Sequence, residues 1–144
     1  MEIPIRRLRD DAVVPRAQHP ADAGSDLVAI EGCVLAPGER TVVATGLSLA
    51  IPEGFAGFVM PRSGLASKFG VTVVNAPGLI DAGYRGEVKV ALINLDLHAS
   101  YTIKAGDRIA QLVIMAVSAV TFAEVAELSN TTRGDAGFGS TGPQ

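Results

Sequence analysis

Turn signals recur at short, regular intervals along the middle of this chain, and their spacing limits the folds that the chain can adopt. Turn-like segments occur at 36–40 (APGER), 52–54 (PEG), 75–78 (NAPG), 81–86 (DAGYRG) and 104–108 (KAGDR), and each is rich in residues that favour turns. The segments between them lack the 3.6-residue period of a long helix. Many short strands joined by tight turns are typical of an all-β sandwich or barrel.

The segments between these turns are rich in β-branched and other apolar residues, as strands are. They comprise residues 41–51, 55–60, 71–75, 87–94 and 108–117. In the 87–94 segment, Val88, Val90 and Leu92 alternate with more polar or smaller residues. This alternation is the period of a half-buried strand, and it predicts that these three side chains face the core.

One short helix is expected within PRSGLASKFG, residues 61–70. Ser63 is a residue type that caps helix starts and Gly70 is typical of a helix end, so we expect a helix from about Gly64 to Phe69. Free N–H groups at a helix start attract anions, and Arg62 would add positive charge beside them. Arg62 and Ser63 are therefore either a plain helix cap or part of a phosphate site.

The composition indicates one folded domain and narrows the classes of partner. With 144 residues, 48% apolar and 19% charged, the chain can bury a sizeable core. A net charge of −3 gives no broad electrostatic reason to bind nucleic acid. No apolar run has the length of a signal peptide or a membrane span, and Cys33 has no second cysteine to pair with. We expect a cytoplasmic protein that binds neither nucleic acid nor membranes.

The chain ends in a glycine-rich segment, and residues 137–142 (GFGSTG) have GxGxxG spacing. Such glycines bind a dinucleotide when a strand precedes them and a helix follows, but only two residues follow here. We therefore expect a β domain over 1–132 and a flexible C-terminal tail over 133–144. The tail is either a plain terminus or a lid, in which Arg133 pairs with phosphate and Phe138 stacks on a base.

Three further polar residues stand where they could either serve the fold or carry chemistry. Asp81 precedes a glycine turn, and it is either a turn residue or a carboxylate that orients a water molecule. Gln111 is expected to share a strand face with Ile109 and Val113, so its amide needs a partner in the fold or in a ligand. Asp26 either finishes a turn or holds metal-bound waters.

Taken in order, five segments of the chain resemble the five motifs of the homotrimeric dUTPase family, the deoxyuridine triphosphate nucleotidohydrolases. The segments are AGSDL (23–27), PRSGLA (61–66), NAPGLIDAGYRGEV (75–88), GDRIAQLV (106–113) and RGDAGFGSTG (133–142). The resemblance covers most of the chain. It implies an all-β, jelly-roll-like sandwich or barrel, a homotrimer, and three active sites that each draw on all three chains, with the tail reaching a neighbour.

The resemblance also implies hydrolysis of dUTP to dUMP and pyrophosphate by Mg2+-assisted attack of water on the α-phosphate. This reaction would lower dUTP and supply the precursor of dTMP. Asp81 would be the catalytic residue that positions the water, Asp26 would hold waters on the Mg2+ ion, and Tyr84 would pack on the deoxyribose. The other substrate-binding residues that the resemblance implies are Arg62, Ser63, Gly64, Asn75, Gly78, Leu79, Ile80, Lys89, Gln111, Arg133, Gly137, Phe138, Gly139, Ser140 and Thr141.

The implied roles divide these residues between the two ends of a nucleotide. Asn75 and the backbone of the hairpin would bind uracil. Ser63, Gly64 and Gln111 would contact phosphates, with support from Arg62, and the tail would close over the base and the γ-phosphate.

The sequence departs from the family pattern at two positions, and two other functions remain open. Ser25 stands where the family often has tyrosine, and Ala136 stands where glycine is usual, which restricts the backbone of the tail. One alternative is a dCTP deaminase-like enzyme, although its usual glutamate after the hairpin is not evident in VKVALIN (88–94). The other is a non-catalytic trimeric binding protein, which would need no carboxylate that positions water.

Overall fold

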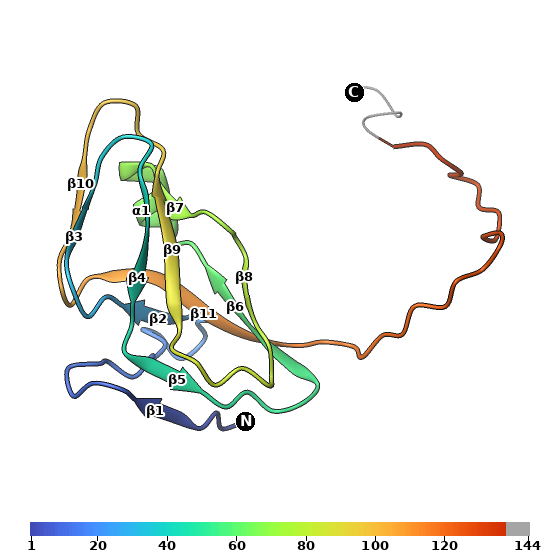
Figure 1. Ribbon diagram of the computed structural model, residues 1–144, viewed down its shortest axis with the longest axis horizontal. Coiled ribbons are helices and arrows are strands. Elements are labelled where there is room, and N and C mark those ends of the chain that lie inside the picture. The colour runs from blue at the N-terminus through green and yellow to red at the C-terminus, as the bar shows by residue number, and fades with distance from the viewer. Residues whose placement is uncertain (138–144) are drawn as a thin grey trace.

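The computed structural model describes residues 1–137, and within them it contains eleven short strands and one helix (Figure 1). In chain order these elements are β1 (Ile5–Arg7), β2 (Ser25–Val28), β3 (Cys33–Leu35), β4 (Arg40–Ala44), β5 (Leu47–Leu49), β6 (Phe55–Met60), α1 (Ser63–Phe69), β7 (Val71–Val73), β8 (Gly78–Ile80), β9 (Lys89–Asn94), β10 (Tyr101–Ile103) and β11 (Arg108–Ala116).

Two larger sheets and two smaller ones make up the β domain. The larger sheets have the strand orders β2-β11-β6-β8 and β4-β9-β7, and β1-β5 and β10-β3 form two-stranded sheets. Every pairing of neighbouring strands is antiparallel. The predicted all-β, jelly-roll-like class with one short helix is confirmed.

The core lies between these sheets and consists mainly of leucine, isoleucine and valine. Val88, Val90 and Leu92 are 2%, 0% and 1% exposed, so the alternation read from the 87–94 segment is confirmed. Leu27 of β2 and Ile109 of β11 are buried in the same core. The strands that carry the candidate site residues are therefore fixed by apolar packing.

The predicted run 41–51 is divided into two strands that belong to different sheets. β4 pairs with β9, whereas β5 pairs with β1. Between them Gly46 has a φ of 69°, a left-handed conformation that glycine adopts without a steric penalty. The chain therefore changes direction at Gly46 and leaves one sheet for another. The short strands β1, β2, β3 and β10 lie outside the predicted runs, and so does β8, which begins at the last residue of the 75–78 turn segment and ends before the 81–86 segment.

The predicted helix is present, but the expectation that Ser63 caps it is wrong. The N-cap residue is Arg62, and Ser63 is the first residue of α1. The N–H groups of Leu65 and Ala66 both donate to the Arg62 carbonyl, at 3.1 and 3.0 Å, so the first turn closes one residue earlier than predicted. Gly70 ends the helix with a φ of 67°, as expected for a left-handed C-terminal residue.

Beyond β11 the chain leaves the β domain. Val117 still donates its N–H to the Gly54 carbonyl at 2.9 Å, and the following residues then extend away from the sheets (Figure 1). We call residues 117–137 the arm. Its side chains Phe122 and Leu128 are 94% and 87% exposed. Regular structure thus ends well before the predicted border at 132/133, and the division into domains stays a prediction.

Across residues 1–137, α1 is the one helix and is too short to cross a membrane.

Candidate active site

The described residues that were predicted to bind a ligand lie mainly around two separate hollows. The first group, which we call the arginine cluster, consists of the predicted residues Asp26, Arg62, Ser63, Gly64 and Gln111 together with Arg108, which was not predicted. The second, which we call the hairpin cluster, consists of Leu79, Ile80, Asp81, Tyr84 and Lys89. Within the described part of the chain the two hollows share no lining residue.

The arginine cluster forms because the strand register places polar residues in one row. In the four-stranded sheet, Gln111 of β11 lies opposite Asp26 of β2 on one side and Met60 of β6 on the other. The start of α1 follows Met60 after two residues. Three segments that are far apart in the sequence therefore meet around a hollow of about 330 Å3.

Asp26 joins the two arginines of this cluster. Its carboxylate lies 3.2 Å from Arg62 Nε and 3.1 Å from Arg108 Nη1, and its side chain is only 14% exposed. Arg62 Nη1 also donates to the Arg108 carbonyl at 2.9 Å. Two guanidinium groups and one carboxylate leave this network with a net positive charge on an acidic protein, which favours an anionic ligand.

Gln111 is held by the fold. It shares a strand face with Val113 as predicted, because the register with β6 is unbroken there, but the prediction that it also shares the face of Ile109 is wrong. The register between β11 and β2 shifts between Arg108 and Ala110, and such a bulge interrupts the alternation of faces. Ile109 and Ala110 are both buried as a result, while Gln111 does not share the face of Ile109 and donates Nε2 to the Pro61 carbonyl at 3.0 Å. The amide thus has the structural partner that was one of its two predicted alternatives.

A glycine lies directly beneath the Gln111 side chain. A Cβ atom added to Gly24 would lie 3.1 Å from Gln111 Cδ and 3.3 Å from its Cβ, closer than ordinary van der Waals contact. Gly24 therefore lets the amide lie against the backbone at the rim of the hollow.

The hairpin cluster lies at the other end of the same sheet. Ile80, at the end of β8, lies opposite Gly57 of β6, and Asp81 follows it. Asp81 is exposed and lines a hollow of about 220 Å3 together with Tyr84 and Lys89. An exposed carboxylate can accept a hydrogen bond from a water molecule.

The segment from Asp81 to Val88 is braced by its own bonds. The Tyr84 N–H donates to the Asp81 carbonyl at 3.0 Å, and Tyr84 Oη donates to the Glu87 carbonyl at 3.0 Å. Arg85 Nη1 donates to the carbonyls of Ala82 and Tyr84 at 2.6 and 2.8 Å. These bonds fix the turn that presents Asp81 and Tyr84.

The same segment is anchored to the chain around β5. Ser48 Oγ donates to the Arg85 carbonyl at 2.7 Å, and the buried Thr45 Oγ1 donates to the Val88 carbonyl at 2.6 Å. The Gly46 N–H donates to Glu87 Oε1 at 2.9 Å. The hairpin is thereby held at several points along its length.

Lys89 and Asn75 occupy the edges of the hairpin cluster. Lys89 Nζ lies 3.4 Å from Glu87 Oε2, so its charge is partly balanced within the chain. Asn75 is exposed, and its side-chain amide lies beside Gly78 at the start of β8, where Nδ2 would be 3.4 Å from a Cβ added at Gly78. Asn75 and β8 therefore present polar groups to the same space.

The predicted tail residues are described only in part. Arg133 Nε donates to the Ala136 carbonyl at 2.9 Å, so this side chain contacts its own arm. Gly137 is the last described residue, and Phe138, Gly139, Ser140 and Thr141 lie outside the described residues.

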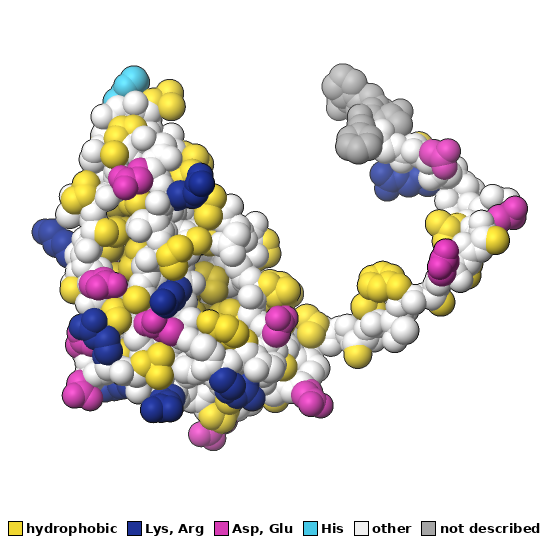
Figure 2. Space-filling model, viewed as in Figure 1, with side chains coloured by type: hydrophobic (Ala, Val, Ile, Leu, Met, Phe, Trp, Pro, Cys, Tyr) yellow, Lys and Arg dark blue, Asp and Glu magenta, His cyan; other side chains and the backbone are white. Residues whose placement is uncertain are grey.

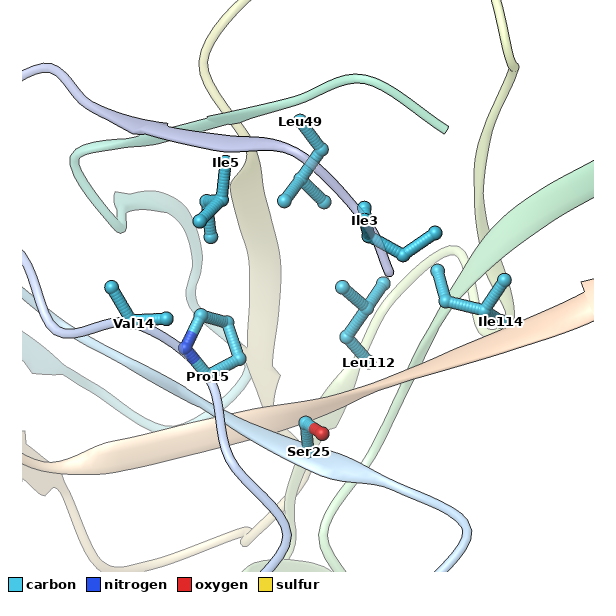
Figure 3. A pocket seen from close by; sticks show the side chains of 8 residues that line it. All are labelled: Ile3, Ile5, Val14, Pro15, Ser25, Leu49, Leu112 and Ile114. Carbon is cyan, nitrogen blue, oxygen red and sulfur yellow. The ribbon is translucent and has the colours of Figure 1, made fainter. Parts of the chain in front are cut away.

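A third hollow lies next to Ser25, and its chemistry differs (Figure 3). It encloses about 140 Å3 between β1, β5 and the four-stranded sheet. Apart from Ser25, every side chain that lines it is apolar; these are Ile3, Ile5, Val14, Pro15, Leu49, Leu112 and Ile114. The small serine leaves this space open, and a hollow without charged groups offers nothing to an anionic ligand.

Arg108 and Ser48 were missed as site-supporting residues. Arg108 follows the turn before β11, where an arginine gives no local sign of a role in a site. Its ion pair with Asp26 depends on pairing across strands.

Nucleophilic cysteine chemistry is not supported, since burial raises the pKa of the Cys33 thiol, as do the carboxylates of Glu39 and Glu31.

The donor set of the arginine cluster fits a hydrated magnesium ion carried by a polyphosphate. Among residues 1–137, no three of the side chains that ligate metals gather into one site, and both Asp26 oxygens already contact arginines. Mg2+ keeps several waters and is commonly bound through one or two carboxylates plus substrate phosphates. Asp26 therefore suits contact with waters of the ion.

Comparison with known proteins relates the whole chain to one family. The family model for dUTPase matches residues 10–142. The deoxyuridine 5'-triphosphate nucleotidohydrolase of Thermobifida fusca is 57% identical over 142 residues, which are 99% of this chain and 79% of that protein. That of Corynebacterium glutamicum is 55% identical, over 97% of this chain and 94% of that protein.

A solved structure of a related phage enzyme has the same fold. The dUTPase of Staphylococcus bacteriophage 80alpha, solved with dUpNHpp, matches with a TM-score of 0.91 and 32% identity over 99% of each chain. These similarities favour neither a dCTP deaminase-like enzyme nor a non-catalytic binding protein.

Proposed function

Because the chain belongs to the dUTPase family, we propose that it hydrolyses dUTP to dUMP and pyrophosphate. The observation that carries the proposal is the pairing of two complementary half-sites on one sheet. The arginine cluster offers net positive charge to a triphosphate. The hairpin cluster offers an exposed carboxylate beside an aromatic ring, Asp81 beside Tyr84.

Asp81 is the residue proposed to carry the chemical step. Its carboxylate accepts a hydrogen bond from a water molecule and aims the oxygen lone pair at the α-phosphorus. The new bond joins that oxygen to the α-phosphorus while the proton lost by water passes to the Asp81 carboxylate and from there to solvent. The bond from the α-phosphorus to the oxygen that bridges it to the β-phosphorus breaks, and pyrophosphate leaves with that electron pair. Phosphoryl transfer depends chiefly on such alignment and on stabilising charge, and the braced turn from Asp81 to Tyr84 supports alignment.

The arginine cluster is proposed to hold the triphosphate. Arg62 supplies charge, and Ser63, Gly64 and Gln111 contact phosphate oxygens at the mouth of α1. Asp26 is proposed to hold waters of a Mg2+ ion that the triphosphate carries. When bound, the ion would offset negative charge and polarise the leaving group. One relative, a dUTPase variant from phage phi11 of Staphylococcus aureus, was solved with its coordination of a structural Mg(II) ion.

The hairpin and the tail are proposed to recognise the nucleoside. Asn75 and the backbone of β8 bind uracil, Tyr84 packs on the deoxyribose, and Lys89 lines the same hollow. Within the tail, Arg133 and the residues 137–141 close over the substrate. A ribose would place its 2′-hydroxyl against the Tyr84 ring, so UTP should be a poor substrate.

A complete site is proposed to need more than one copy of the chain, in a homotrimer. β6 leads into α1 and β8 leads into Asp81, but these strands are antiparallel neighbours. Their ends therefore point to opposite ends of the sheet (Figure 1). Asp81 follows Ile80, which lies opposite Gly57, so it is displaced from Met60 by four residues, about 13 Å along the sheet. The exposed apolar side chains of the arm also support contact with a neighbour.

The proposal also includes a cytoplasmic location, which the single cysteine, Cys33, supports. The net charge of −3 gives no broad electrostatic reason to bind nucleic acid.

The decisive test is release of pyrophosphate from a panel of dUTP, dCTP, dTTP and UTP with Mg2+. We expect turnover of dUTP well above the other three. Asp81→Asn should abolish turnover while leaving binding of dUpNHpp largely intact. Equal rates on all four nucleotides would refute the base and sugar assignments, and release of ammonia from dCTP would favour a deaminase.

A further inference from the structure

The ring of Tyr84 lies across the backbone of Gly86, two residues further along the hairpin. A Cβ atom added at Gly86 would lie 2.6 Å from Tyr84 Cζ and 2.9 Å from Cε2, far inside van der Waals contact. Gly86 is not among the glycines of positive φ in the described chain. The backbone there suits any residue, so glycine is required for space alone.

Hydrogen bonds hold the tyrosine in this place. Tyr84 Oη donates to the Glu87 carbonyl at 3.0 Å, across the position of Gly86. The Tyr84 N–H donates to the Asp81 carbonyl at 3.0 Å. One side of the ring therefore rests on the hairpin backbone, and the side chain borders the hollow that also contains Asp81.

We propose that Gly86 is a positioning residue, whose missing side chain seats the Tyr84 ring and so sets the wall that selects deoxyribose over ribose. The inference rests on the proposed dUTP hydrolysis. A ring displaced toward the hollow would obstruct the sugar, and a ring displaced outward would leave room for a 2′-hydroxyl. Either change alters the choice between dUTP and UTP.

An alanine at position 86 should move the ring and leave the fold intact. Tyr84 is 46% exposed, so its ring can rotate into solvent more easily than the backbone can shift. The bonds that anchor this segment do not involve the ring, because Ser48 Oγ reaches the Arg85 carbonyl and the Val88 N–H reaches the Leu47 carbonyl.

Gly83 offers a matched control in the same hairpin. Within residues 1–137, a Cβ atom added at Gly83 would have no neighbouring heavy atom within 4 Å, apart from its own chain neighbours. Its φ is not positive either. Gly83→Ala therefore makes the same chemical change, with the same loss of backbone freedom, and leaves Tyr84 in place.

The test compares kcat/KM for dUTP and for UTP in the wild type, Gly86→Ala, Gly83→Ala, Tyr84→Ala and the double variant Gly86→Ala/Tyr84→Ala. Gly86→Ala should lower kcat/KM for dUTP by about 10- to 100-fold, since a misplacement of about 1 Å can cost 100-fold. The ratio of dUTP to UTP should fall toward that of Tyr84→Ala. Gly83→Ala should stay within about twofold of wild type.

The double variant separates action through Tyr84 from a general effect on the hairpin. If Gly86 acts by seating the ring, its substitution adds less than about twofold once the ring is gone. Multiplication of the two single effects would overturn the inference, as would Gly86→Ala behaving like Gly83→Ala.

The position of the ring can be followed without turnover. The chain has two tyrosines, so NMR of protein labelled on tyrosine rings reports Tyr84 and Tyr101, and a Tyr101→Phe variant assigns them. Gly86→Ala should shift the Tyr84 signals, and Gly83→Ala should not. Unchanged Tyr84 signals with an active wild type would overturn the seating alone, whereas a wild type that releases no pyrophosphate from dUTP would overturn the proposed function and with it the role in sugar selection.

Discussion

Mixing two inactive variants should restore activity if each site takes its hairpin cluster and its arginine cluster from different chains. Asp81→Asn removes the carboxylate proposed to orient water, and Arg62→Gln removes a cation that contacts Asp26 at 3.2 Å. Because β6 and β8 pair antiparallel, these two groups lie toward opposite ends of the same sheet in one chain. In a mixed assembly, some sites combine an intact Asp81 from one chain with an intact Arg62 from another.

The size of the recovery follows from random assembly. With equal amounts of the two variants, a given position holds either chain with equal chance, so about one quarter of sites receive both intact groups. Loss of one catalytic group or one charge-stabilising donor costs about 100- to 1,000-fold or more. The mixture should therefore exceed the separate variants by about 25-fold or more.

The assay is pyrophosphate release from dUTP after the two variants are unfolded and refolded together. The same variants refolded apart and combined at low temperature just before the assay serve as the control, and circular dichroism checks that each variant folds. Recovery no greater than the sum of the separate activities would mean that one chain supplies both groups. In that case the inference from strand direction is wrong.

Three further changes test the energetics of the site. Asp26→Asn should lower Tm by about 2–8 °C, because loss of two partly exposed ion pairs lowers the free energy of unfolding by about 1–2 kcal/mol. The same variant should bind metal-free pyrophosphate more tightly, and weaker binding in calorimetry would contradict the assigned charge balance. Thr45→Val should lower Tm by about 2–12 °C, since the buried hydroxyl that bonds the Val88 carbonyl is lost at about 1–3 kcal/mol; an unchanged melting curve would remove Thr45 as an anchor. Truncation after Thr132 should cut turnover severely at an unchanged Tm, and full activity would reject the lid.

Local sequence patterns were sufficient to predict features that are set within a single strand or helix. The alternation of Val88, Val90 and Leu92 predicted a buried strand face, and Gly70 marked the end of α1. Each of these features depends on neighbouring residues, so the sequence alone could reveal it. The five segments between residues 23 and 142 that resemble the family motifs then indicated which polar residues were candidates for the site.

Local sequence patterns could not predict which strands pair or in what register. The bulge after Arg108 buries both Ile109 and Ala110 and separates Gln111 from the face of Ile109, and nothing local marks the extra residue. Arg108 was missed because its partner, Asp26, lies 82 residues away. The role of Gly86 was also hidden, since a glycine needed for space looks the same in sequence as one needed for a turn.

The two half-sites differ from the arm in how far they are already ordered within one chain. Turn and anchor bonds fix the hairpin, and the ion pairs around Asp26 fix the arginines. The proposed association of copies would therefore bring together groups that have little freedom left to lose. Figure 2 shows the arm standing apart from the β domain, with apolar side chains exposed along it. Holding this segment against a neighbouring chain would cost conformational entropy. Substrate binding should therefore depend on the arm for completion of the site, while the braced turn that carries Asp81, the carboxylate proposed to align water, is formed beforehand.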